Sequence, residues 1–308
     1  MKKDLISIRD LSGEELRDLF DLAADLKARQ RREEPHLLLS GKTLALIFEK
    51  PSLRTRVTFE VAMTQLGGRA VYLAPADIGL GEREPVEDVA RSLSRWVDGI
   101  AARTFTHELV EQLAEWAGVP VINALTDRLH PCQVLADLLT IQEKRGRLAG
   151  TRVVFIGDGN NVANSWLSGA ALMGMHLVVA CPSGYEPDHT ILAEAQRVAR
   201  DTGARLTLLH DPQVAAEGAE VLYTDAWASM GQEAEREKRL REFHGFQVDA
   251  ALVARAKRDV LVMHCLPAHR GEEITDEVLD GPHSIVFDQA ENRLHLQKAI
   301  LVRLLGSR

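Results

Sequence analysis

Hydrophobic and polar positions along the chain follow two alternating periodicities. The stretch SGEELRDLFDLAADLKARQ (12–30) has helical spacing, with apolar residues on one face at Leu16, Leu19, Phe20, Ala23 and Leu26. Ser12 and Glu15 fit a capping box, so a helix is predicted to begin here. Strand-like apolar runs then alternate with helical patterns, and the first of them are TLALIF (43–48), AVYL (70–73), GIAAR (99–103) and VPVIN (119–123).

A second series of strand-like runs follows the helical stretch QVLADLLTIQEKRG (133–146): TRVVFIGDG (151–159), HLVVA (176–180), RLTLL (205–209), EVLYTD (220–225) and DVLVMHCLP (259–267). Such alternation predicts parallel sheets covered by helices. We therefore predict an α/β fold of two domains, each a parallel sheet flanked by helices. The first domain is expected to span 1–140 and to be joined by a C-terminal helix at 288–308, and the second to span 150–287. Polar stretches repeatedly follow the strands, which predicts an active site in the cleft between the domains.

Composition narrows the class of protein. The chain has 308 residues, 45% apolar and 27% charged, with a net charge of -8 and a pI near 5.8. This balance disfavours a general nucleic-acid binder, which needs excess basic charge. No run approaches the ~18 apolar residues of a membrane span, and MKKDLISIRD lacks the apolar core of a signal peptide, so a cytoplasmic protein is expected. The three cysteines have no CxxC spacing, which predicts neither a disulfide framework nor a structural zinc site.

Residues 48–60, FEKPSLRTRVTFE, place two arginines where a buried strand meets a helix. The free N–H groups of a helix N-terminus, the hydroxyls of Ser52 and Thr55 and the guanidinium groups of Arg54 and Arg56 together suit a phosphate. The alternative is that Ser52 caps the helix while the arginines are solvated or pair with nearby glutamates. The motif GxxxxGK[ST] does not occur, which argues against a P-loop.

Two further polar stretches follow predicted strands near the middle of the chain. In HPCQ (130–133), His130 could donate to a carbonyl oxygen and Gln133 could pair with an amide, although Pro131 could also simply start a helix. GDGNNVANS (157–165) has Val162 where a dinucleotide-binding turn requires its third glycine, which disfavours a dehydrogenase. Its asparagines indicate hydrogen bonding, either to a ligand or as a helix cap.

The last two stretches that carry candidate functional side chains follow later predicted strands. In TDAWASMGQE (224–233), Asp225 offers a carboxylate for an ammonium group, whereas Met230 alone would usually be a core residue. In MHCLP (263–267), Cys265 could be a small buried apolar residue or a group of the site, because its reactivity depends on a pKa that the sequence does not reveal.

In order and spacing these motifs resemble those of the aspartate and ornithine carbamoyltransferase family, from SLRTR at 52 to ENRLH at 291–295. The family usually has STRTR, so Leu53 departs from the pattern at a position expected to contribute its backbone N–H. The resemblance implies that carbamoyl phosphate is bound by Ser52, Leu53, Arg54, Thr55, Arg103, His130, Pro131, Cys132, Gln133, Cys265, Leu266 and Arg293, with Arg103, His130 and Cys265 as catalytic groups. It also implies that Arg56 takes part in phosphate binding.

The resemblance further distinguishes the amine substrate. SMG (229–231) and HCLP (264–267) are similar to the ornithine enzymes of the family, whereas the aspartate enzymes carry HPLP. The ornithine-binding residues implied in this way are Asn161, Asp225, Ser229, Met230 and Cys265. The loop ADIGLGERE (76–84) lacks a glutamine that some members carry, and no ligand contact is assigned to it.

The resemblance implies an enzyme of arginine biosynthesis that transfers the carbamoyl group of carbamoyl phosphate to the δ-amine of L-ornithine. The expected products are L-citrulline and phosphate. No metal or organic cofactor and no dedicated catalytic base are implied. The expected assembly is a homotrimer or a multiple of it, with shared active sites and domain closure. The alternatives are transfer to N-acetylornithine, putrescine or aspartate, and a non-catalytic sensor of carbamoyl phosphate or ornithine.

Overall fold

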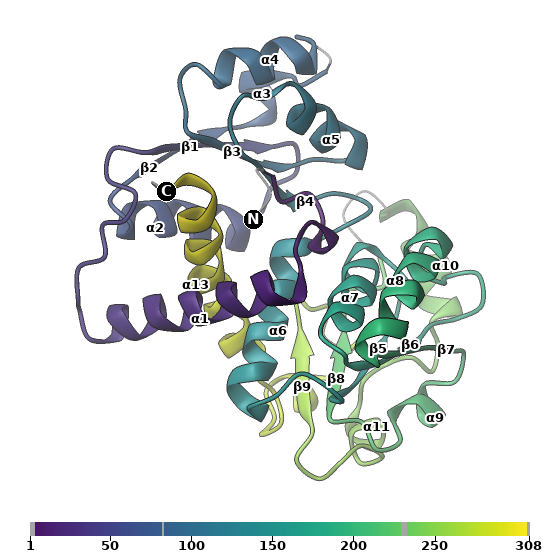
Figure 1. The fold of residues 1–308 in the computed structure, drawn as a ribbon. Coiled ribbons are helices and arrows are strands. Elements are labelled where there is room, and N and C mark those ends of the chain that lie inside the picture. Colours follow the sequence, from purple (N-terminus) through teal and green to yellow (C-terminus); the bar gives the residue numbers. More distant parts are fainter. Residues whose placement is uncertain (1–3, 82, 229–232, 307–308) are drawn as a thin grey trace. The chain divides into compact units, whose positions relative to one another are not determined.

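The structure, a computed structural model, describes residues 4–81, 83–228 and 233–306 (Figure 1). The chain divides into two compact units: unit 1 is Met1–Leu139 with Glu291–Arg308, and unit 2 is Thr140–Ala290. The division falls within two helices, α6 (Pro131–Arg145) and α13 (Val286–Leu305). The predicted α/β class is confirmed, while the predicted position of the active site between the domains stays a prediction.

The sheet of unit 1 has the strand order β2-β1-β3-β4, and all of its pairs are parallel. Its strands are β1 (Thr43–Phe48), β2 (Arg69–Leu73), β3 (Gly99–Arg103) and β4 (Val121–Leu125). The last strand begins two residues later than the run 119–123 predicts. Its pairing with β3 starts at Ile100 and Val121, because Pro120 has no N–H to give to a ladder and contributes its carbonyl to Ile100 N instead.

Helices cover both faces of this sheet; in Figure 1, α3, α4 and α5 lie on one side and α2 and α13 on the other. The helical segments are η1 (Ile8–Asp10), α1 (Gly13–Arg31), α2 (Leu53–Gln65), α3 (Pro75–Ile78), α4 (Val86–Leu93) and α5 (His107–Trp116), in addition to α6 and α13. The capping box at the start of α1 is confirmed: Ser12 Oγ accepts from Glu15 N at 3.1 Å, and Glu15 Oε2 accepts from Ser12 N at 2.8 Å.

The core of unit 1 is built from alternate strand positions. Ala45 and Ile47 of β1 and Ile100 and Ala102 of β3 belong to one buried apolar cluster with residues of α4 and α5, including Val89. The period of two along each strand sends these side chains to a single face, and a helix pair closes over it.

The sheet of unit 2 has the order β7-β6-β5-β8-β9, again wholly parallel. Its strands are β5 (Arg152–Ile156), β6 (His176–Ala180), β7 (Arg205–Leu209), β8 (Val221–Thr224) and β9 (Leu261–His264). The helices of this unit are α7 (Asn161–Leu172), α8 (His189–Thr202), α9 (Pro212–Ala216), η2 (Glu233–Glu235), α10 (Arg236–Glu242), α11 (Ala250–Val253) and α12 (Asp276–Leu279).

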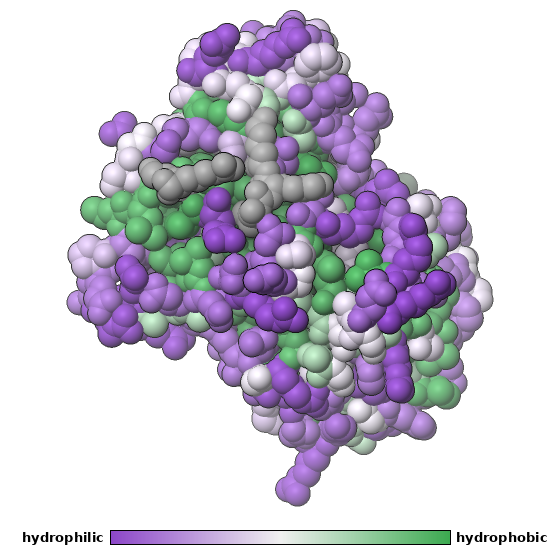
Figure 2. Space-filling view, in the orientation of Figure 1, coloured by the Kyte–Doolittle hydropathy of each residue, from purple (hydrophilic) through white to green (hydrophobic). Residues whose placement is uncertain are grey.

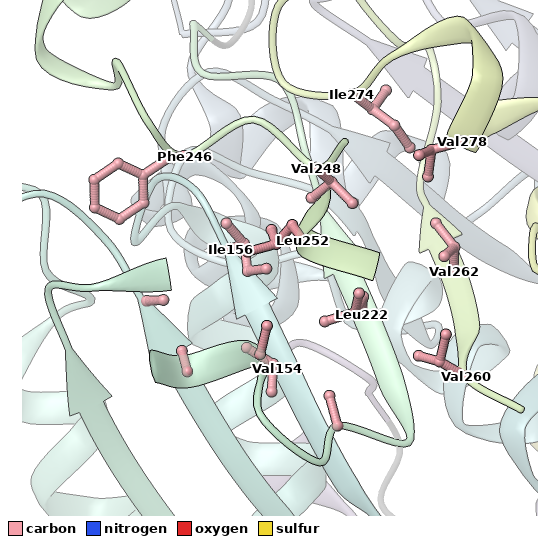
Figure 3. Packing of buried hydrophobic residues seen from close by; sticks show 14 of the residues in the cluster. Val154, Ile156, Leu222, Phe246, Val248, Leu252, Val260, Val262, Ile274 and Val278 are labelled. Atoms are coloured by element: carbon pink, nitrogen blue, oxygen red, sulfur yellow. The ribbon is translucent and has the colours of Figure 1, made fainter. Parts of the chain in front are cut away.

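Figure 3 shows the apolar cluster of unit 2, in which side chains of β5, β8 and β9 meet residues of α11, of α12 and of the segments beside them. Ile156, Leu222 and Val262 are fully buried, and Leu252 and Ile274 pack with them. Burying each such side chain stabilises the fold by about 1.5–3 kcal/mol. Among the described residues, none of the helices combines the length and apolar character that crossing a bilayer requires.

Candidate active site

The strand order of each sheet reverses at one place: between β1 and β3 in unit 1, and between β5 and β8 in unit 2. Parallel sheets bind ligands at the carboxyl ends of the strands beside such a reversal, where the two connections diverge and leave a crevice. The last residues of these four strands and the segments that follow them carry FEKPSLRTR, Arg103, GDGNN and Asp225. The topology therefore brings the predicted site residues of each unit to one edge of its sheet.

In unit 1 the ends of β1 and β3 are held side by side. Phe48 pairs with Arg103 in the ladder, and Glu49 N donates to the carbonyl of Arg103 at 2.9 Å. Glu49 Oε2 also accepts from Phe105 N at 2.7 Å, so this carboxylate links the segment after β1 to the segment after β3. Arg103 is buried, with 4% of its surface exposed. It is thus not the solvated strand-end charge that its position alone would indicate.

The N-terminus of α2 is formed by the SLRTR motif. Ser52 is the cap, and its Oγ accepts from Thr55 N at 3.3 Å. Leu53 is exposed and Arg54 is half-buried in the first turn. Arg56 Nε donates to Glu60 Oε1 at 2.9 Å, and its guanidinium lies 3.7 Å from the centroid of the Tyr72 ring. Arg56 thus forms a surface ion pair with a nearby glutamate, while its part in phosphate binding stays a prediction.

A hydrogen-bonded network of unit 1 joins α2, α6 and α13. Arg293 Nη1 donates to Gln133 Oε1 at 2.6 Å, and its Nη2 donates to Thr55 Oγ1 at 3.1 Å. Gln133 Nε2 donates in turn to Asp137 Oδ1 at 2.8 Å. Asp137 therefore fixes which end of the Gln133 amide faces Arg293. We call Ser52–Thr55, Arg103, His130–Gln133 and Arg293 the unit 1 cluster.

His130 and Cys132 flank Pro131, the first residue of α6. Burial, and then the nearby cations Arg293 and Arg103, hold the pKa of His130 well below its usual range. His130 is consequently a neutral imidazole at working pH, which can donate one hydrogen bond without carrying charge. Burial raises the pKa of the Cys132 thiol to about 12, so Cys132 is a packed side chain and not a nucleophile.

In unit 2, Asp225 is the centre of the contacts at the sheet edge. Cys265 Sγ donates to Asp225 Oδ1 at 2.9 Å, and Asn160 Nδ2 donates to Asp225 Oδ2 at 2.7 Å. Asn160 is also the cap of α7, because its Oδ1 accepts from Val162 N at 2.9 Å. Asn161 is the first residue of α7 and is half-buried. Ser229 and Met230 lie outside the described residues. We call Asn160, Asn161, Asp225, Cys265 and Leu266 the unit 2 cluster.

The sequence did not identify the side chains that orient the predicted ones. Asn160 was expected only to take part in hydrogen bonding, yet it holds the second oxygen of Asp225. Asp137 carries no motif signal of its own, although its position four residues after Gln133 in a predicted helix places both on one face. Spacing of that kind is the one sequence signal that could have found it.

Comparison with known proteins identifies the family. Residues 3–143 match the model of the aspartate/ornithine carbamoyltransferase carbamoyl-P binding domain, and residues 149–304 match that of the Asp/Orn binding domain. The chain belongs to the aspartate/ornithine carbamoyltransferase family. It is 54% identical over 305 residues to an ornithine carbamoyltransferase from Methanosarcina acetivorans, covering 99% of this chain and 100% of that protein.

Further members of the carbamoyltransferase family match over the same length. A Pyrococcus furiosus protein named ornithine carbamoyltransferase, anabolic, is 53% identical over 304 residues, covering 99% of this chain and 96% of the relative. The solved structure of ornithine carbamoyltransferase from Pyrococcus furiosus superposes with a TM-score of 0.97 at 53% identity, covering 99% of this chain and 97% of that one. The fold expected from the family resemblance is therefore confirmed.

The two family domains divide the chain differently from its compact units at the C-terminus. The second carbamoyltransferase domain model extends to residue 304, whereas α13 from Glu291 onward belongs to unit 1. The reason lies in its contacts. Lys27 Nζ donates to Asn292 Oδ1 at 2.7 Å, and Arg293 is bound to Gln133 and Thr55. The last helix therefore brings a cation to the unit 1 cluster.

Proposed function

We propose that the chain transfers the carbamoyl group of carbamoyl phosphate to the δ-amine of L-ornithine, giving L-citrulline and phosphate. The observation that carries this proposal is the contact of Cys265 Sγ with Asp225 Oδ1 at 2.9 Å. In this proposal the thiol and the carboxylate belong to the amine side of the site, and Cys265 lies in the HCLP segment that is similar to the ornithine enzymes of the family. Full-length relatives named ornithine carbamoyltransferase support the same substrate.

The unit 1 cluster binds carbamoyl phosphate in this proposal. Arg54 and the N–H groups at the start of α2 hold the phosphate, because a helix N-terminus concentrates donors and positive potential. Leu53 contributes its backbone N–H to the phosphate. Arg56 contributes only through its positive charge, without direct contact. Pro131 and Cys132 shape the start of α6, from which Gln133 faces the carbamoyl group.

Three donors of unit 1 stabilise the carbonyl oxygen as negative charge builds on it: Thr55, Arg103 and His130. A neutral His130 suits this role because it adds a hydrogen bond without competing with Arg103 for the phosphate. Donors that are fixed before the reaction lower the barrier most, since no reorganisation accompanies the charge development. Arg293 supports them through Gln133 and Thr55.

The unit 2 cluster binds ornithine. Asn161 and Asp225 hold the α-amino and α-carboxylate end, and Cys265 with Asp225 orients the δ-amine. Ser229 and Met230, which lie outside the described residues, contribute to this side by resemblance to the family. The backbone carbonyl of Leu266 accepts from the carbamoyl nitrogen.

The neutral δ-amine attacks the carbamoyl carbon and forms a C–N bond, and the carbonyl π electrons move onto oxygen. Collapse of this tetrahedral intermediate breaks the bond to the phosphate oxygen, and phosphate leaves with the bonding pair. The departing phosphate accepts the proton that the nitrogen loses. Catalysis then consists of positioning and charge stabilisation by the groups above, and it uses only protein groups and the two substrates.

We also propose a homotrimer, or a multiple of it, acting in arginine biosynthesis in the cytoplasm. Figure 2 shows apolar residues at the surface in the region where Figure 1 places α2 and β2. Leu53, Val57 and Val71 of these elements are 74%, 45% and 47% exposed, and exposed apolar patches commonly mark subunit contacts. The name of the anabolic relative supports the biosynthetic role. Sedimentation velocity tests the assembly: a monomer would contradict it.

The proposal is tested by following both products at once. Purified protein with carbamoyl phosphate should release phosphate only when L-ornithine is present, and citrulline and phosphate should form in equal amounts. Binding of either ligand without turnover would instead support a sensor. Phosphate release without citrulline would indicate hydrolysis and contradict the proposed transfer.

A further inference from the structure

Glu273 is a fully buried carboxylate to which neither the sequence nor the roles above assign a task. One of its oxygens, Oε1, accepts from His264 Nε2 at 2.9 Å and from His269 N at 2.6 Å. Its second oxygen lies 3.7 Å from His269 Nδ1. Burial strongly destabilises a carboxylate unless donors compensate for the lost solvation, so the presence of Glu273 here needs an explanation.

The contacts of His264 fix where its single proton lies. Leu266 N donates to His264 Nδ1 at 2.8 Å, and an imidazole nitrogen that accepts a hydrogen bond cannot itself carry a proton. The proton must therefore be on Nε2, which faces the Glu273 carboxylate. His264 is neutral and fully buried, and the carboxylate selects the tautomer that leaves Nδ1 free to accept.

The acceptor at Nδ1 of His264 is important because it holds the backbone of Leu266. Leu266 has a φ of 58°, in the left-handed region that residues other than glycine rarely adopt. Such a conformation is strained and persists only where surrounding contacts impose it. The hydrogen bond from Leu266 N is one such contact. A second is the bond from His264 N to Gln289 Oε1 at 3.1 Å, which holds the end of β9.

This segment carries the amine-side groups of the proposed reaction. Cys265 lies between the two bonded residues, with its thiol 2.9 Å from Asp225, and the carbonyl of Leu266 is the proposed acceptor for the carbamoyl nitrogen. A turn of the 265–266 backbone away from the left-handed conformation would move both groups together. The direction of the Leu266 carbonyl thus depends on His264, and His264 depends on Glu273.

We propose that Glu273 is a positioning residue for amine attack: through the Nε2-protonated tautomer of His264 it sets the backbone of Cys265 and Leu266. The inference rests on the proposed carbamoyl transfer. It adds a residue that touches neither substrate and acts through two successive hydrogen bonds.

Steady-state kinetics of three variants test the proposal. Glu273→Ala removes the acceptor and should lower kcat by about tenfold to a hundredfold, the scale of a small misplacement of reacting groups. It should raise the KM for ornithine and leave the KM for carbamoyl phosphate unchanged. Glu273→Gln keeps an acceptor oxygen and should retain most of the activity. Glu277→Gln, an exposed glutamate four positions further on, is the matched control and should behave as wild type.

The pattern of constants separates positioning from loss of folded protein. A smaller folded fraction lowers kcat and leaves both KM values unchanged, so that result for Glu273→Ala would overturn the proposal. So would wild-type kcat and ornithine KM in a variant whose circular dichroism matches wild type. Should Glu273→Ala not fold, the tautomer of His264 in the wild-type protein decides.

The tautomer is read by nuclear magnetic resonance of protein labelled with ¹⁵N-histidine, with the His264 signal assigned by its loss in His264→Asn. The expected signal is that of a neutral ring protonated on Nε2, retained in Glu273→Gln and altered in Glu273→Ala. A ring protonated on Nδ1 or on both nitrogens would overturn the inference. This measurement needs no turnover, so a wild-type protein without transferase activity would contradict the proposed function and leave the tautomer test intact.

Discussion

Arg293 Nη1 donates a hydrogen bond to Gln133 Oε1 at 2.6 Å, although the two residues are 160 positions apart in sequence. The contact links the last helix of the chain to the start of α6. Because the same guanidinium also binds Thr55 Oγ1, one buried cation holds two elements of the unit 1 cluster together. A residue near the C-terminus is therefore part of the unit 1 cluster.

Replacing Arg293 by methionine should weaken both the site and the fold of unit 1. Gln133 and Thr55 would each lose a donor in a buried setting, and each unsatisfied group costs about 1–3 kcal/mol. We expect Arg293→Met to lower the free energy of unfolding by an amount in this range and to raise the KM for carbamoyl phosphate. Denaturant titration and initial-rate kinetics measure the two effects. A stable variant with wild-type kinetics would remove Arg293 from the site.

Arg54 and Arg56 should differ in their effect on carbamoyl phosphate, even though both belong to SLRTR. Arg56 is engaged by Glu60 and stacks on Tyr72, whereas Arg54 is half-buried in the first turn of α2. We expect Arg54→Gln to raise the KM for carbamoyl phosphate by tenfold or more, at ~1.4 kcal/mol per factor of ten. Arg56→Gln, the matched variant, should have a distinctly smaller effect. Equal effects would contradict the separation of roles.

The pH dependence of the rate should come from the substrate amine and not from His130. Burial and the cations Arg293 and Arg103 hold the pKa of His130 well below its usual range, so above that lowered pKa the ring is neutral and does not titrate near pH 7. The δ-amine of ornithine has a lysine-like pKa near ~10.4, and its reactive neutral fraction grows about tenfold per pH unit below that value.

We therefore expect kcat/KM for ornithine to rise from pH 7 to pH 9. His130→Asn should lower it by about a hundredfold or more at every pH, because a charge-stabilising donor is lost while the titrating group remains. Initial rates across this range measure both profiles. A profile that falls from pH 7 to pH 9, or an acid limb that disappears in the variant, would contradict a neutral His130.

The stability of the protein should depend on pH through Lys298, which is fully buried against Gln30 and His36. Burial lowers the pKa of this amine to about 8, below its value in the unfolded chain. Between the folded and unfolded pKa values the unfolded state binds more protons, so stability rises with pH in this window and is lost as pH falls through about 8.

Comparison with Lys298→Met isolates this contribution. Relative to the variant, the free energy of unfolding of the wild type should rise by on the order of 2 kcal/mol between pH 7.5 and pH 10. Denaturant titrations of both proteins at each pH cancel the groups that they share. A difference that does not change with pH would show that the amine keeps an ordinary pKa.

Apolar runs and the alternation of apolar and polar residues were sufficient to predict the strands. TLALIF became the buried strand β1 with the predicted bounds, and RLTLL became β7 with the predicted bounds although none of its residues is fully buried. VPVIN was placed two residues early, since composition does not reveal which residue first joins a ladder. Propensity is local, and strand register is decided by the partner strand.

The hydrogen-bond and ion-pair partners of side chains were less predictable from the sequence than the helices and strands. The polar residues after each strand could be identified as a candidate site, but nothing local distinguished Arg103 from a surface charge or assigned a role to Glu273. Both are buried in the fold, which no local pattern indicated. Arg56 illustrates the opposite case: its motif indicated phosphate, while Glu60, one helical turn away, offered the ion pair that forms.

The substrate of the enzyme is tested most directly by detecting ureido product after incubation with carbamoyl phosphate and, separately, L-ornithine, N-acetylornithine, putrescine or aspartate. The account predicts strong product formation with L-ornithine alone, because the contact of Cys265 with Asp225 lies in the segment that is similar to the ornithine enzymes. Product with one of the other amines in place of ornithine would contradict the role given to the unit 2 cluster, and no product with any amine would contradict catalysis itself.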